Sequence, residues 1–272
     1  MNDTYRTEPP VSRAEPSAGR GLERRRLAGA ATIGAALDRG AEIQIVLAPR
    51  SGLSADEVAI VERARALGIE VRLTSERERL RLTDGRQAET LLALEGPSPR
   101  PSLDELMDRG GLVLVLVGVR YPGNVGFIVR AAEVAGATGI VLAETWTRTE
   151  RASAMRFAMQ ADRFFPVIDA EVDAAVASAR RAGRRLLALE TEGEKTPWEA
   201  VLEGSLALFL GGEAEGIPAA ILAQMDACLR IPMRGFIPSY NVQAAAGIVL
   251  GEWLRRTQDP NSGCAGESAG ES

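Results

Sequence analysis

Short apolar runs alternate with longer amphipathic segments from residue 112 to residue 256. The runs have the length of strands and few polar positions, as expected for parallel strands that are covered on both faces. Between most of them, apolar residues recur with helical spacing, and glycine or proline marks the boundaries. This pattern predicts an α/β fold with a doubly wound parallel sheet and right-handed crossovers. The predicted strands are 112–118, 139–143, 164–168, 184–190, 206–211 and 227–233, and the predicted helices are 125–137, 150–162, 170–183, 218–225 and 240–256.

The first part of the chain predicts a smaller α/β domain over residues 21–95. Three prolines in 96–102 predict a stiff linker, which extends to 109 and leads into the larger domain over 110–257. Residues 1–20 and 258–272 are rich in small and polar residues and are predicted to be disordered. The predicted elements of the smaller domain are helices over 27–40 and 55–68, the latter with Ser54 as its N-cap, strands over 42–49 and 69–75, and a charged helix or turn over 76–84.

Composition bounds the class of protein. The chain has 272 residues, of which 46% are hydrophobic and 25% charged, so it can bury the cores of two domains. No apolar run reaches the roughly 18 residues that a membrane span needs, and the N-terminus lacks the apolar core of a secretory signal. The two cysteines, Cys228 and Cys264, do not suggest a disulfide framework, so we expect a reducing, cytoplasmic location.

The chain contains no histidine. This excludes Ser-His-Asp and Cys-His catalysis and any histidine-ligated metal site, and two cysteines cannot form an all-thiolate zinc site, so we expect no metal. Chemistry must then depend on arginine, carboxylates, amides, hydroxyls and backbone groups. The net charge of −5 argues against a general nucleic-acid coat but not against a local basic groove. The arginines at 24–26 form either an RNA-facing patch or a solvated helix start.

Three loops follow predicted strands, at the edge of the sheet where α/β proteins bind ligands. The first, 118–130, lacks the G-x-G-x-x-G spacing of dinucleotide-binding proteins. Asn124 is placed there to cap the next helix, and Arg130 follows six residues later. An arginine in an apolar helix favours an anionic partner or a groove, although a plain surface arginine is the alternative.

The second loop, 209–218, contains three glycines that let backbone approach a ligand. Glu213 and Glu215 would repel phosphate, so a nucleoside or a cationic ligand is favoured; the alternative is a helix start with favourable acidic residues. In the third loop, 230–241, Ser239 is predicted to cap the helix over 240–256. A polar loop between the end of a strand and the start of a helix is a common ligand-binding position. The alternative is that Ser239 only caps a helix of the core.

Together and in this order, the three loops resemble the motifs of the SpoU/TrmH-type RNA 2′-O-ribose methyltransferases of the trefoil-knotted superfamily. The resemblance lies in PGNVGFIVRAAEVAGATGIVL, LFLGGEAEGIP and IPMRGFIPSYNVQAAAGIVL, and it covers residues 110–256. It implies a deep trefoil knot, bound S-adenosyl-L-methionine (AdoMet), a homodimer through the knotted domain, and a ribosomal-protein-like RNA-binding domain before it. The arrangement is also similar to the thiostrepton-resistance methyltransferases, which implies self-protection against an antibiotic as one possible role.

Site residues follow from the resemblance, position by position. The cofactor contacts would be Leu189, Gly211, Ile231, Met233, Tyr240 and Asn241. Arg130 would activate the ribose hydroxyl, either as a base that has lost its proton or, as we favour, as a cation that stabilises the developing alkoxide. Asn124 and Glu213 would orient Arg130 and the substrate, while Ser239 and Asn241 would hold the third loop.

Two departures from the family pattern leave a second function open. The third motif has Ser239-Tyr240-Asn241 where Ser-Leu-Asn is usual, preceded by Pro238 where Glu is common, and the segment over 156–161 also differs. The main hypothesis is an AdoMet-dependent 2′-O-ribose methyltransferase acting on structured RNA, most of all ribosomal RNA. The alternative is a non-catalytic RNA-binding or ribosome-assembly paralogue with a degenerate pocket. A nucleotide-binding oxidoreductase lacks its glycine fingerprint.

Overall fold

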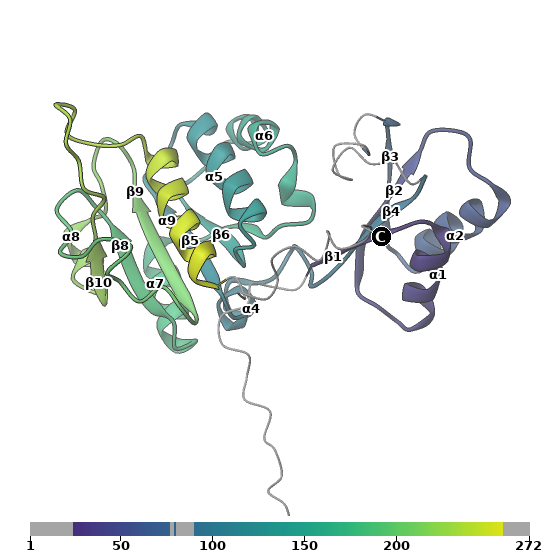
Figure 1. The fold of residues 1–272 in the computed structure, drawn as a ribbon, viewed down its shortest axis with the longest axis horizontal. Coiled ribbons are helices and arrows are strands. Elements are labelled where there is room, and N and C mark those ends of the chain that lie inside the picture. The colour runs from purple at the N-terminus through teal and green to yellow at the C-terminus, as the bar shows by residue number, and fades with distance from the viewer. Residues whose placement is uncertain (1–23, 77–78, 80–89, 258–272) are drawn as a thin grey trace, which may run out of the picture.

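The computed structural model of the chain describes residues 24–76, 79 and 90–257, and two separate sheets organise them (Figure 1). The first is four-stranded, in the order β1-β4-β2-β3. Strands β2 and β3 are parallel, whereas β4 runs antiparallel to both its neighbours. The elements of this part are β1 (Arg25–Ala28), α1 (Ala30–Asp38), β2 (Ile43–Pro49), α2 (Ala55–Ala66), β3 (Glu70–Thr74) and β4 (Leu92–Glu95).

The second sheet has six strands in the order β10-β8-β9-β5-β6-β7, and every pairing in it is parallel. The α/β fold with a parallel sheet is therefore confirmed. Its elements are α4 (Leu103–Asp108), β5 (Leu112–Val117), α5 (Pro122–Val134), β6 (Gly139–Ala143), α6 (Arg148–Phe157), β7 (Val167–Asp169), α7 (Val172–Arg181), β8 (Arg185–Leu189), β9 (Leu206–Gly211), α8 (Ala219–Leu222), β10 (Ala227–Leu229) and α9 (Val242–Thr257).

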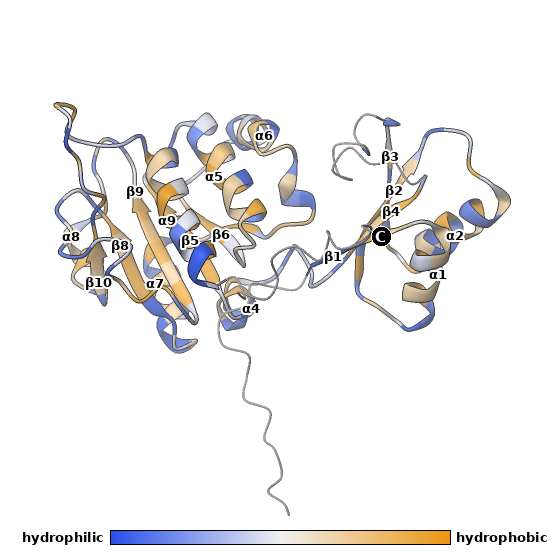
Figure 2. Ribbon diagram, in the orientation of Figure 1, coloured by the Kyte–Doolittle hydropathy of each residue, from blue (hydrophilic) through white to orange (hydrophobic). Residues whose placement is uncertain are grey.

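Helices cover both faces of the six-stranded sheet. One apolar core lies between the sheet and α5, α6 and α9, and a second lies between the other face and α4, α7 and α8. All six residues of β5 are buried, which explains its unbroken apolar run. Figure 2 shows apolar colouring along strands of this sheet, most clearly along β9. No helix in the described ranges is long and apolar enough to cross a membrane.

Arg184 fastens α4 to the main sheet from a buried position, with only 2% of its surface exposed. Its guanidinium donates to the carbonyl oxygens of Met107 at 2.7 Å, Gly111 at 2.8 Å and Leu206 at 2.8 Å, and also to those of Leu106 and Arg109. These carbonyls include the last ones of α4, which have no partner within the helix. The cation also opposes the negative end of the helix dipole.

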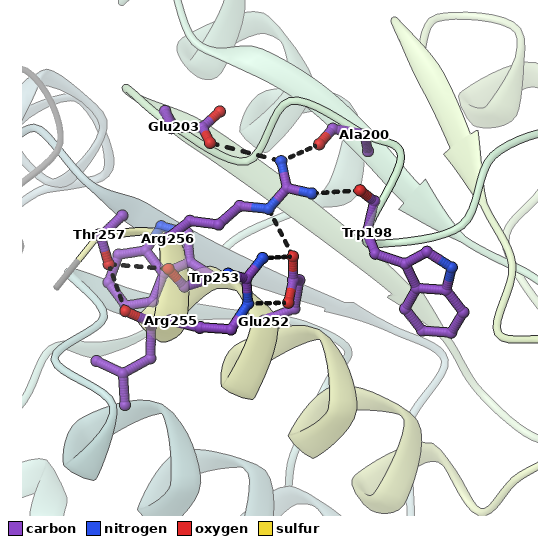
Figure 3. A network of polar contacts seen from close by, with 9 residues as sticks. Trp198, Ala200, Glu203, Glu252, Trp253, Arg255, Arg256 and Thr257 are labelled. Carbon is purple, nitrogen blue, oxygen red and sulfur yellow. Dashed lines mark hydrogen bonds and ion pairs between the residues drawn. The ribbon is translucent and has the colours of Figure 1, made fainter.

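A second arginine fastens the end of α9 (Figure 3). Arg256 Nε donates to Glu252 one turn earlier at 2.6 Å, and its terminal nitrogens donate to the carbonyl oxygens of Ala200, at 2.7 Å, and Trp198. Arg255 also binds Glu252, at 2.8 Å. The last turn of α9 is therefore tied to the loop between β8 and β9, far away in sequence.

Several sequence-based boundaries are wrong in the smaller sheet. The predicted helix over 27–40 begins only at Ala30, because Arg25–Ala28 pairs with Leu92–Glu95 as a strand that the sequence did not indicate. Gly29, at φ 81°, makes the turn between strand and helix. The helix at Ala55 is confirmed, with Ser54 and Glu57 forming a capping box. The charged segment over 76–84 and both predicted disordered tails lie largely or wholly outside the described residues.

In the larger sheet, strands and helices shift by a few residues. The strand predicted over 227–233 ends at Leu229, and the one over 164–168 is found at Val167–Asp169. The helix predicted over 150–162 ends at Phe157, because Met159 and Gln160 adopt positive φ angles. The helix predicted to begin at Val125 begins at Pro122, whose fixed φ suits the first helical turn.

Candidate functional site

A pocket of about 350 Å³ opens at the carboxyl ends of β8 and β9, beside the start of α9. Small-molecule sites in α/β proteins occupy this edge of the sheet and have volumes of this order. It is lined by Leu189, Glu190, Thr191, Leu210, Gly211, Gly212, Glu213, Glu215, Gly216, Ile231, Met233, Ser239, Tyr240, Val242 and Ala245. Its walls are thus apolar on the strand side and acidic on the side of the glycine loop.

Close backbone contact explains why glycines follow β9. A Cβ atom at Gly212 would lie 2.0 Å from the carbonyl oxygen of Gly118, so the loops after β5 and β9 touch backbone to backbone. A Cβ atom at Gly211 would lie 2.7 Å from the carbonyl carbon of Gly216 and 2.8 Å from Glu190 Oε1. Gly216 has φ 62°, a conformation that side chains disfavour. Only glycine therefore fits this turn at its present width.

The carboxylate of Glu190 is the polar group that the turn encloses. Its Oε1 accepts a hydrogen bond from the backbone N–H of Ile217 at 2.7 Å, and its own amide donates to the carbonyl of Leu229 at 2.9 Å. With Glu213 and Glu215, it gives the pocket three carboxylates, and no arginine or lysine lines the pocket.

Nearby, burial raises the pKa of the Cys228 thiol, and the negative charges of Glu190 and Glu194 raise it further. The pocket therefore favours a cationic or hydrogen-bond-donating ligand, and Cys228 is a poor nucleophile.

Two asparagines connect the pocket to α5. Asn124 Nδ2 donates to Glu213 Oε1, and Asn241 Nδ2 donates to Asn124 Oδ1 at 3.2 Å. Asn124 is buried, although it lies within the first turn of a helix. This network joins the three loops after β5, β9 and β10, which are far apart in sequence. The sequence prediction that these residues belong to one site is consistent with this arrangement.

Neither of the two helix caps predicted at this site, Asn124 and Ser239, is formed. Asn124 is the third residue of α5, whose N-cap is Tyr121, so its side chain is free for Glu213. Helix α9 begins at Val242 rather than at Tyr240, and Asn241 Oδ1, not Ser239, accepts the backbone N–H of Gln243, at 2.9 Å. Ser239 instead lines the pocket. The proline at 122 and the side chain of Asn241 explain these two corrections.

Arg130 does not line the pocket of its own chain. It is exposed on α5, and within the described residues no carboxylate or carbonyl pairs with it. Tyr240 lies at the pocket wall, where its hydroxyl donates to the carbonyl of Pro232 at 3.4 Å. This hydrogen bond joins the two ends of the third loop. The structure thus brings Tyr240 to the pocket and leaves Arg130 outside the pocket lining.

Seven of the predicted site residues line the pocket, two lie in the adjoining asparagine network, and one lies apart. The lining ones are Leu189, Gly211, Glu213, Ile231, Met233, Ser239 and Tyr240. Asn124 and Asn241 form the network, and Arg130 is separate. Sequence reasoning missed Glu190. Its signal was a carboxylate directly after a buried parallel strand. Among the described residues, no cluster of three or more metal-ligating side chains occurs.

Solved structures of known proteins share this fold. A solved RNA 2′-O ribose methyltransferase is 28% identical, with a TM-score of 0.51 over 86% of this chain and 88% of that one. The AdoMet-bound rRNA methyltransferase from Sinorhizobium meliloti shares the fold, with a TM-score of 0.57 at 24% identity over 87% and 88%.

The curated relatives are similar to this chain over only part of their own length. The 23S rRNA (guanosine-2′-O-)-methyltransferase RlmB of Xylella fastidiosa (strain 9a5c) is 35% identical over 164 residues, which are 57% of this chain and 64% of that protein. The chain thus spans less than two thirds of that relative. The model of the SpoU rRNA Methylase family matches residues 111–251, which include the whole pocket and the asparagine network. The chain therefore belongs to the SpoU rRNA Methylase family.

Proposed function

We propose that this protein transfers a methyl group from AdoMet to a ribose 2′-hydroxyl of structured RNA, with ribosomal RNA as the substrate. The observation that supports this most directly is the acidic, glycine-walled pocket joined to the Asn124–Glu213–Asn241 network in a SpoU family chain. The relatives support it as well: one is named a 23S rRNA (guanosine-2′-O-)-methyltransferase, and one structural neighbour was solved with AdoMet bound.

The pocket suits AdoMet in size, polarity and charge. Its volume of about 350 Å³ is within the range of nucleoside-sized sites, and the apolar side chains of Leu189, Leu210 and Ile231 offer a surface for a flat base. Three carboxylates favour a cation, and the glycine turn lets backbone groups approach it closely. When bound, AdoMet supplies an electrophilic methyl group on a positively charged sulfur. Such a methyl needs no activation, so the protein's contribution is largely positioning.

The side chains around the pocket divide into two roles. Asn124, itself bound by Asn241, fixes the carboxylate of Glu213, which lines the pocket. Arg130 is free to act on substrate, because no protein group in the described ranges neutralises it. An arginine remains protonated at neutral pH, so its role is to stabilise the alkoxide that develops on the ribose oxygen. The position of Arg130 outside its own pocket favours a site completed by a second copy of the chain.

A homodimer is therefore part of the proposal. Helix α9 exposes Ala244, Gly247 and Gly251, and no atom would meet a Cβ at either glycine, so this face allows another backbone to approach. Phe127 on the neighbouring α5 is 42% exposed, and Phe236 is fully exposed. Large apolar side chains that are exposed in one chain are candidates for burial against a partner.

Sedimentation velocity tests the dimer. Gly247→Lys has room in the monomer and improves helix propensity by up to about 1 kcal/mol, so a shift to the monomer would come from the interface and not from unfolding. Ala177→Lys, exposed on α7 on the opposite face of the sheet, is the matched control and should leave the dimer intact. A wild-type monomer at micromolar concentration contradicts the dimer.

The deep knot and the domain division are further parts of the proposal. The loop between β8 and β9 contacts both ends of the segment from β10 to α9, for example through the Lys195 carbonyl with the Arg230 amide and through the Ala200 carbonyl with Arg256. These contacts support α9 running beneath that loop, as a trefoil knot requires. We assign residues 21–95 to an RNA-binding domain, 96–109 to a linker and 110–257 to the knotted domain. The structural neighbours that cover 86–87% of the chain support a shared two-part arrangement. A cytoplasmic location follows from a ribosomal substrate.

The alternative function is a non-catalytic RNA-binding or ribosome-assembly paralogue. Tyr240 in the pocket wall, and the altered segment over 156–161, favour it. Calorimetric titration with AdoMet separates the two functions, because a degenerate pocket would give no heat of binding at millimolar ligand. Mapping 2′-O-methyl positions across total RNA, with and without the protein, identifies the target.

Arg130→Ala then tests the reaction. We expect methyl transfer to fall by at least a hundredfold, as for loss of an oxyanion-stabilising group, with AdoMet affinity unchanged. Equal transfer rates for variant and wild type would exclude Arg130 from the reaction. Antibiotic self-protection is tested by the drug susceptibility of a ribosome methylated by this protein, and unchanged susceptibility would exclude it.

A further inference from the structure

We propose that Glu190 is a cofactor-selecting residue, whose carboxylate accepts hydrogen bonds from the ribose hydroxyls of the adenosine moiety. This inference rests on the proposed function and deepens it. Glu190 directly follows Leu189, the last residue of β8; it lines the pocket and is half-buried. No role is assigned to it by the three loop motifs, since it lies outside all of them.

The carboxylate is held in a fixed position with one oxygen unused. Oε1 accepts from the Ile217 amide at 2.7 Å, and both oxygens lie against Gly216, where a Cβ would be 3.0 Å from Oε1 and 3.5 Å from Oε2. No hydrogen-bond donor in the described residues binds Oε2. An ionised carboxylate accepts about four hydrogen bonds and donates none, so the free oxygen requires a donor from water or from the ligand.

The position of Glu190 distinguishes which part of the ligand it meets. Under the proposed function, the network of Asn124, Glu213 and Asn241 marks the part of the pocket nearest to the reacting atoms, and among the described residues Glu190 makes no hydrogen bond to it. Its chain neighbour Leu189, which pairs with Leu210, belongs instead to the apolar wall that suits the base. In adenosine, the group next to the base is the ribose. Its two adjacent hydroxyls donate to one carboxylate, as in dinucleotide-binding proteins with an acidic residue near a strand end.

The alternative partner is the ammonium group at the other end of AdoMet. That group is separated from the base by the ribose and the sulfur, so Glu190 would have to reach past the sugar. Glu215 is the matched comparison, because it also lines the pocket but is exposed and binds no backbone amide among the described residues.

Calorimetry with the full chain tests the proposal through paired ligands. The probes are S-adenosylhomocysteine, its 2′,3′-dideoxy analogue, and 5′-methylthioadenosine, which retains the ribose but lacks the ammonium. A charge-assisted hydrogen bond has a strength that corresponds to about tenfold or more in affinity. We expect wild type to bind the dideoxy analogue about tenfold more weakly than S-adenosylhomocysteine, and Glu190→Gln to abolish most of this difference. Glu215→Gln should leave the difference unchanged.

Other outcomes overturn the assignment. If Glu190→Gln weakens the hydroxylated and dideoxy ligands equally, Glu190 only supports the glycine turn. If it weakens S-adenosylhomocysteine but not 5′-methylthioadenosine, the ammonium is the partner. Should the variant fail to fold, the wild-type pair alone decides, because equal affinities for the two analogues exclude a ribose contact. Wild type that binds neither AdoMet nor S-adenosylhomocysteine contradicts the proposed function itself, a result distinct from all of these.

Discussion

Arg184→Met removes the buried guanidinium that fastens α4 to the six-stranded sheet. Methionine has a similar length and fits an apolar surrounding, so the change isolates the loss of hydrogen bonds and charge. We expect the free energy of unfolding to fall by roughly 2–5 kcal/mol. The neighbouring Arg185→Met is the matched control, since Arg185 is exposed and its side chain donates to a single described carbonyl, that of Val201, at 3.1 Å.

Two opposing terms set this magnitude. Arg184 donates to five carbonyl oxygens; that of Gly111 also accepts the Leu206 amide and keeps a partner after the change. The carbonyls at the end of α4 lose their donor, at about 1–3 kcal/mol for each that remains buried. Against this, burial lowers the pKa of Arg184 to about 10 from its usual 12.5, which corresponds to a cost of roughly 3 kcal/mol for the charged form. The methionine avoids that cost, so the net loss is smaller than the sum of the hydrogen bonds.

Urea unfolding followed by tryptophan fluorescence measures the effect. All three tryptophans, at 146, 198 and 253, lie in the part of the chain that forms the six-stranded sheet, so the signal reports that part. For a slope of about 2 kcal/mol/M, the expected loss moves the midpoint by about 1–2.5 M. Arg185→Met should move it by less than about 0.5 M. Equal midpoints for the two variants would refute the reasoning that buried carbonyls at the end of α4 depend on Arg184.

Three further changes test other parts of the structure. Gly212→Ala places a Cβ 2.0 Å from the Gly118 carbonyl oxygen, so we expect AdoMet affinity to fall at least tenfold and the melting temperature to drop. The control Gly235→Ala, with open space around it, should change neither the affinity nor the melting temperature. Unaltered AdoMet affinity in Gly212→Ala would exclude the loop contact. Gly126→Ala meets the Ala154 carbonyl oxygen at 2.3 Å and should destabilise the contact of α5 with α6 by about 1–3 kcal/mol; a thermal melt unchanged from wild type would contradict this. Hydrogen bonds from Arg255 and Arg256 lower the pKa of Glu252 to about 2. Because the folded-state pKa of Glu252 lies below the usual 4.5, its stabilisation of the fold is present above pH 4.5 and is lost as the pH falls toward 2. Glu252→Gln should therefore make the helical circular dichroism signal less dependent on pH between pH 4.5 and 2. A pH dependence identical to that of wild type would contradict the assignment.

The sequence predicted the larger sheet well because its strands have an unambiguous pattern. Six apolar runs with helices between most of them admit few arrangements other than a parallel sheet. The smaller sheet was harder to predict. Arg25–Ala28 is too short to show a strand pattern, and it is a strand only because Leu92–Glu95, some 65 residues away, pairs with it. Local propensity carries no information about a pairing partner that is distant in sequence. The Ala-rich segment after Gly29 is strongly helical, so the predicted helix was extended too far toward the N-terminus.

At the site, the sequence indicated which residues gather but not how they bond. Asn124 and Asn241 were identified, yet the first was read as a helix cap and the second had no predicted partner. Their hydrogen bond depends on the approach of two loops 117 residues apart. Glu190 was missed for a related reason, because its partner amide, Ile217, belongs to the next strand's loop. Motif reading identifies positions in one loop at a time, whereas the side-chain network is a property of all three.

The strand order has a consequence for how the protein is made. Strand β5 lies in the middle of the sheet, with β6 on one side and β9 on the other. The ribosome produces β6 soon after β5, but Leu206, the partner of Leu112, emerges nearly a hundred residues later. At about 5–20 residues per second, this interval lasts roughly 5–20 s. During that time the most apolar strand of the nascent chain has one unpaired edge, which exposes it to chaperones and to other nascent chains, and slower synthesis would lengthen the exposure.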